Sequence, residues 1–203
     1  IVFTLVLPPY ASPDEEAHFN SAYRLANRIE GYSSRQLAEE TIYRRAEDIN
    51  ETFENKYTDV FTYEYIDKHF FEKSQNNDIV STENNWIVHD FDGVYFMGAL
   101  GILAGKTLNL GYIQMAYLGR MFNLLFFTFC LYFAIKITPT GKNIFMVLGF
   151  LPIVMHITNS FSRDTFVISL GFLLTAYLLS LLNQKECNKM WQLILLVVIC
   201  TLL

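Results

Sequence analysis

The chain has 203 residues, of which 52% are hydrophobic and 17% are charged, and its formal net charge is −5. The charges are segregated, because residues 8–92 hold 18 acids and eight bases whereas residues 93–203 hold two acids and seven bases. This pattern is typical of a polar loop joined to membrane spans, and it argues against a single soluble core and against a nucleic-acid partner.

The chain opens with an apolar run, residues 1–7. Seven residues cannot cross a bilayer, which needs about 20. We expect this run to be the outer end of a truncated first transmembrane helix, with a signal-peptide remnant as the alternative. The chain also stops within an apolar stretch, and we therefore expect an N-terminal fragment of a larger protein.

Residues 8–92 form the large polar loop, which we expect to be mainly helical. Its first helix opens at Ser12, a good N-cap, with Glu15 completing a capping box and Gly31 as a plausible stop. A second helix is predicted over Ser34–Asn55, from an apolar stripe at helical spacing. Residues 75–85 are expected to form an exposed loop.

Residues 93–119 are apolar but repeatedly broken by glycine. The interruptions predict an interfacial or re-entrant pair of helices, although a short span is also compatible with the composition.

The rest of the chain predicts transmembrane helices at 120–137, 144–162 and 164–182, with the start of a further one at 190–203. Buried helices of a soluble protein are the alternative, but the runs leave no polar faces. We expect an all-α polytopic membrane protein of the cell membrane.

The orientation of these helices follows from four lysines in the short turns. If the spans alternate in direction, Lys136, Lys142, Lys185 and Lys189 fall on one side of the membrane. The positive-inside rule makes that side cytoplasmic. The loop 8–92 is then extracytoplasmic.

The densest group of reactive side chains lies at the start of the loop. Helical spacing puts Asp14 and His18 on one face, where a carboxylate and an imidazole could act as general base or bind a divalent metal. Acids in a first helical turn also complement the helix dipole, and capping alone accounts for Glu15.

Four further candidates lie in or next to the predicted spans. Arg120 stands at the outer mouth of a span, where it could bind a phosphate with both arms of its guanidinium or serve only as an interfacial anchor. The tight outer turn contains Arg163 and Asp164, and Asp164 could simply cap the next helix. His156 lies within a span, as polar groups that face a bundle interior do, and Pro152 predicts a kink there.

Three strings resemble one family of bacterial multi-pass membrane proteins, the domain of unknown function 2142. They are PPYASPDEEAHFNSAYRLANRIEG, YLGRMFNLLFFTFCLYFAIK and FLPIVMHITNSFSRDTFVISLGFLLTAYLL. The family is similar to GT-C-type glycosyltransferases. That resemblance implies a helical bundle, a sugar donor carried on polyprenyl phosphate, and chemistry at the outer membrane face. It implies a catalytic or metal-binding role for Asp14 or Glu15, with Asp164 in a comparable second position.

We therefore expect an enzyme that transfers a sugar from a lipid-phosphate donor to an envelope glycan or another acceptor. The expected catalytic residues are Asp14, Glu15 and His18, and Asp14 and Asp164 could hold Mg²⁺ or Mn²⁺. Substrate contacts are expected from the four remaining candidates, Arg120, His156, Arg163 and Asp164. The alternatives are a transporter or flippase for an envelope lipid, and a non-catalytic partner in polysaccharide assembly.

Overall fold

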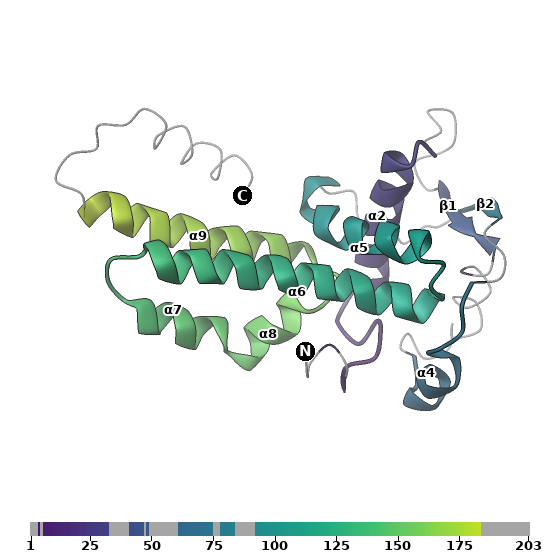
Figure 1. Cartoon of the computed structure of the whole chain (residues 1–203), viewed down its shortest axis with the longest axis horizontal. Coiled ribbons are helices and arrows are strands. Elements are labelled where there is room, and N and C mark those ends of the chain that lie inside the picture. The colour runs from purple at the N-terminus through teal and green to yellow at the C-terminus, as the bar shows by residue number, and fades with distance from the viewer. Residues whose placement is uncertain are drawn as a thin grey trace.

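The computed structural model describes residues 4, 6–32, 41–46, 48, 61–74, 78–83 and 92–183. The predicted span at 190–203 and most of the run 1–7 lie outside this set. The described residues form a cap at one end and a bundle at the other, and one long helix runs through both (Figure 1).

Helix α2, Glu15–Ile29, begins and ends close to the predicted positions. Ser12 N–H donates to the Glu15 carboxylate at 3.3 Å, but the N-cap is Asp14 and not the predicted Ser12. At the other end Gly31 has φ +87°, and Tyr32 N–H donates to the Asn27 carbonyl at 2.8 Å. This is the hydrogen bond of a Schellman C-cap, so the predicted stop at Gly31 is confirmed.

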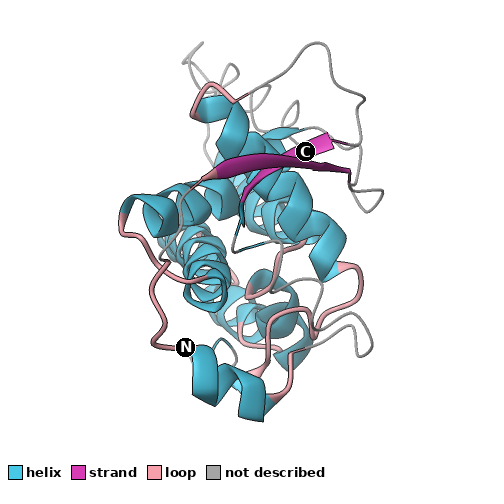
Figure 2. Ribbon diagram, turned by 90° about the vertical axis from the view of Figure 1, so that its right-hand side faces the viewer, coloured by secondary structure: helices cyan, strands magenta, loops and turns pink. Residues whose placement is uncertain are grey.

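The predicted helix over Ser34–Asn55 is wrong for residues 41–45, which form a strand, whereas the described residues 46 and 48 are helical. Strand β1, Thr41–Arg45, pairs antiparallel with strand β2, Ile79–Glu83, and Tyr43 lies opposite Ser81. Both strands are rich in β-branched residues, and pairing with a distant segment outweighs the local helical pattern. The predicted exposed loop at 75–85 contains β2, so the fold is mostly helical rather than all-α (Figure 2). A short helix α4, Tyr63–His69, lies between the strands in sequence.

Residues 92–119 do form a helical pair, but its second member continues into the first predicted span. A 3₁₀ turn η1, Asp92–Tyr95, leads into α5, Phe96–Thr107, which packs on α6, Tyr112–Ile137. A Cβ added to Gly101 would lie 2.5 Å from Gly119 Cα. Gly101 and Gly119 therefore permit a close contact between the two helices instead of interrupting either one.

The cap has its own aromatic core, built by α2, α5 and the first two turns of α6. Phe19 packs edge-on against Phe161 with ring centroids 4.9 Å apart, which brings the turn at residues 159–162 into the same core. Its fully or almost fully buried members include Phe19, Ala22, Tyr23, Phe61, Tyr95, Ile102, Tyr112, Met115 and Phe161.

The bundle is formed by the rest of α6 with α7, Lys142–Gly149, α8, Pro152–Thr158, and α9, Arg163–Asn183. The predicted span at 144–162 is thus two helices and not one. Pro152 cannot donate a backbone hydrogen bond and clashes with the preceding turn, so a break before it is the expected result. The predicted span at 164–182 corresponds to α9.

The outer surface of the bundle is apolar. Among the described residues, α6 and α9 are long and apolar enough to cross a membrane. From Arg120 onward α6 has 18 residues, about 27 Å of helix, which is close to the thickness of a bilayer core. Large hydrophobic side chains stand exposed around it, among them Leu125, Phe129, Tyr132, Ile144, Val147, Phe150 and Ile153.

Candidate functional site

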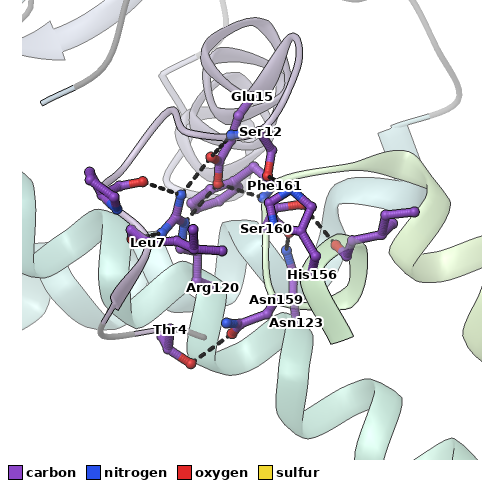
Figure 3. Close-up of polar contacts among 12 residues, drawn as sticks. Thr4, Leu7, Ser12, Glu15, Arg120, Asn123, His156, Asn159, Ser160 and Phe161 are labelled. Carbon is purple, nitrogen blue, oxygen red and sulfur yellow. Dashed lines mark hydrogen bonds and ion pairs between the residues drawn. The ribbon is translucent and has the colours of Figure 1, made fainter. Parts of the chain in front are cut away.

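A buried ion pair joins the cap to the bundle. Arg120 Nε donates to Glu15 Oε1 at 2.7 Å, and Arg120 Nη2 donates to Glu15 Oε2 at 2.6 Å (Figure 3). The side chains are 1% and 0% exposed. This parallel, two-armed contact is the strongest geometry that an arginine and a carboxylate can form.

Both partners use their remaining hydrogen-bonding capacity on the backbone. Arg120 donates to the carbonyl oxygens of Leu7 and Pro8 at 2.6 and 2.7 Å, so four of its five N–H groups are engaged. Glu15 Oε1 also accepts from Phe161 N–H at 3.0 Å. One ion pair therefore fixes the chain before α2, the middle of α6 and the α8–α9 turn.

Further polar contacts surround this pair. Thr4 Oγ1 donates to Asn159 Oδ1 at 2.7 Å, and Asn123 donates to the Ser160 carbonyl at 2.9 Å. Ser12 Oγ lies 3.2 Å from His156 Nε2, within hydrogen-bond distance (Figure 3). Side-chain and backbone hydrogen bonds thus link the three segments that contain the candidate residues.

Asp14 and His18 lie at the N-terminal end of α2, next to this network. Asp14 is exposed, occupies the N-cap position at φ +55°, and makes no capping hydrogen bond with its side chain. His18 is half-buried and its Nδ1 lies 2.8 Å from Tyr95 Oη. The imidazole is therefore oriented by the residue just before α5, and the catalytic roles of Asp14 and His18 stay predictions.

Arg163 and Asp164 begin α9 and are exposed. Asp164 N–H donates to Ser162 Oγ at 3.1 Å, which is consistent with a helix start. Because Phe161 is bonded to Glu15, this turn adjoins the N-terminal end of α2. Exposed acids and an exposed arginine thus flank the buried ion pair.

Within the described part of the chain, no three His, Cys, Asp or Glu side chains gather closely enough to hold a metal ion. The metal-binding role of Asp14 and Asp164 stays a prediction for those two residues alone.

Sequence reasoning placed Glu15 and Arg120 separately and missed that they pair. A signal was present, since residues 112–162 contain no acid. An arginine that is buried in such a segment needs a carboxylate from elsewhere. Glu15, in the first turn of α2, lies beside the start of α9 and supplies this carboxylate.

Comparison with curated proteins and with solved structures gives no match. A family model described as a predicted membrane protein, the domain of unknown function 2142, matches residues 1–203. Two helices of membrane-spanning length and a bundle with an apolar surface agree with that description. The chain therefore belongs to the domain of unknown function 2142 family of membrane proteins.

Proposed function

We propose that the junction between cap and bundle is the active site of a membrane glycosyltransferase. The donor would be a sugar on polyprenyl phosphate and the acceptor an envelope polysaccharide or another glycan. The proposal rests on one observation. The N-terminal ends of α2 and α9 come together at the Glu15–Arg120 ion pair. It brings a carboxylate and an arginine to one place beside an apolar bundle.

The proposal gives each side chain a separate role. Asp14 is the general base that takes the proton of the acceptor hydroxyl, since it is exposed and held by a fixed turn. Arg163 contacts the departing lipid phosphate. Arg120 has four N–H groups committed within the protein, so we assign it a positioning role together with Glu15. His156 positions the turn before α2 through Ser12.

The proposed orientation places the cap outside the cell. Lys136 and Lys142 lie at the end of the bundle away from the cap (Figure 1). Lysines in a short connection favour the cytoplasmic side. The junction then lies at the outer membrane face, where a lipid-linked donor and an envelope acceptor can both reach it.

The test is polymer formation in membranes that contain the full-length protein, normalised to protein level. Asp14→Asn should abolish transfer and leave folding intact, because asparagine is equally suited to an N-cap position and to a positive φ. Asp67→Asn, an exposed acid on α4, is the matched control and should retain wild-type transfer. Full transfer by Asp14→Asn would overturn the catalytic assignment.

A transporter for an envelope lipid is the second candidate, and the break between α7 and α8 is the observation that favours it. Discontinuous helices line substrate sites in many transporters. The two functions predict different intermediates in a strain without the gene. Loss of a transporter leaves complete lipid-linked glycan at the inner face, whereas loss of a transferase leaves unused donor.

A further inference from the structure

An apolar groove runs along the bundle between α7 and α9, at the end that is away from the cap. Its volume is about 550 Å³. Six hydrophobic side chains form most of its wall: Ile144, Phe145, Leu148, Ile168, Phe172 and Leu179. A volume of this size lies within the range of roughly 300–1,000 Å³ that is usual for ligand sites.

The groove is long and mostly apolar, which suits a hydrocarbon chain. The lining residues Ile168 and Leu179 are eleven positions apart on α9, so the groove is about 17 Å long. A hydrocarbon chain that lies along this length would meet a mostly apolar wall.

One end of the groove is positively charged. Thr140 and Gly141 line it there, directly before the N-terminus of α7. Gly141 is the N-cap and offers no side chain to the first-turn N–H groups, which favour an anion. Lys136 and Lys142 adjoin this turn and are exposed, and no acid occurs in residues 112–162.

We propose that this groove binds one acyl chain of an anionic phospholipid, with the lipid phosphate at the N-terminus of α7 beside Lys136 and Lys142. The apolar wall accounts for the chain, and the lysines account for the headgroup. This site is separate from the junction at the cap, and it does not depend on the proposed transferase activity.

Gly171 allows the groove to be blocked without disturbing its walls. It lines the groove, and a Cβ added there would meet no atom within 4 Å. Gly171→Trp should fill the space that the acyl chain occupies, and Gly171→Leu should fill part of it. Leu182→Trp, at an exposed position of α9 that does not line the groove, is the matched control and should leave lipid binding unchanged.

The experiment measures lipids retained by the full-length protein in detergent by native mass spectrometry. The probes are phosphatidylglycerol and phosphatidylcholine with the same acyl chains. We expect retention of phosphatidylglycerol to exceed that of phosphatidylcholine. Each of Lys136→Gln and Lys142→Gln should weaken phosphatidylglycerol retention about fivefold, the factor that corresponds to about 1 kcal/mol per lysine.

Blocking variants separate the possible results. Loss of one retained lipid in Gly171→Trp, with partial loss in Gly171→Leu, supports the proposal. Equal retention of the two lipids by the wild type, or unchanged retention in both blocking variants, overturns it. A lower unfolding temperature of both blocking variants in lipid-free detergent also overturns it, since the groove would then hold a segment of protein.

Discussion

Replacing Arg120 by lysine tests whether the ion pair at the junction holds the protein together. The guanidinium donates twice to Glu15 and once each to the Leu7 and Pro8 carbonyls, from three different nitrogens. A lysine ammonium has a single nitrogen and cannot span these positions. It should lose at least one hydrogen bond to the carboxylate and one to a carbonyl, at a cost of about 2–4 kcal/mol.

The assay is thermal unfolding of the full-length protein in one detergent. Arg120→Ala should be destabilised further, by about 3–5 kcal/mol, because it leaves the buried Glu15 carboxylate without its counter-charge. Arg163→Lys, which changes an exposed arginine at the start of α9, should shift stability by less than about 0.5 kcal/mol. If Arg120→Lys unfolds like the wild type but loses transfer, the positioning role is refuted and a direct contact with the lipid phosphate is favoured.

Three other outcomes are expected. Cysteine introduced at Asp67 should react with a membrane-impermeant thiol reagent in intact cells and cysteine at Lys142 should not; the reverse pattern would place the cap in the cytoplasm. Gly119→Ala should destabilise the protein by about 1–3 kcal/mol, because the new Cβ would lie 2.2 Å from Phe161 Cζ, whereas Gly171→Ala should be nearly neutral in the same unfolding assay. Chelation of divalent cations should stop transfer if a metal assists the acidic residues, and transfer that persists in excess chelator would remove the metal from the mechanism.

The elements that the sequence predicts well are those whose cause is local. Gly31 ends α2 because its backbone adopts positive φ, and Pro152 breaks a helix because of its own ring. Helix α9 corresponds to an apolar run bounded by charges. In each case the residues that decide the outcome lie within a few positions of it.

The elements that escaped prediction depend on partners far away in the chain. Strand β1 is stabilised by its pairing with β2, and no sequence pattern near Tyr43 indicates that pairing. The glycines of α5 predict an interrupted helix, whereas in the structure Gly101 meets Gly119 across the helix pair. The Glu15–Arg120 contact spans 105 positions, so single-segment patterns could suggest both residues but not their contact.

Helix α6 couples the cap mechanically to the bundle. One rigid rod of 26 residues, about 39 Å long, has its first turns in the aromatic core of the cap and its last turns in the core of the bundle. Arg120 lies between these two cores, where it contacts α2 directly and the α8–α9 turn through Glu15. A tilt of about 10° at that point would move Ile137 by about 4 Å. A displacement of the cap would therefore be transmitted through α6 to the turn before α7.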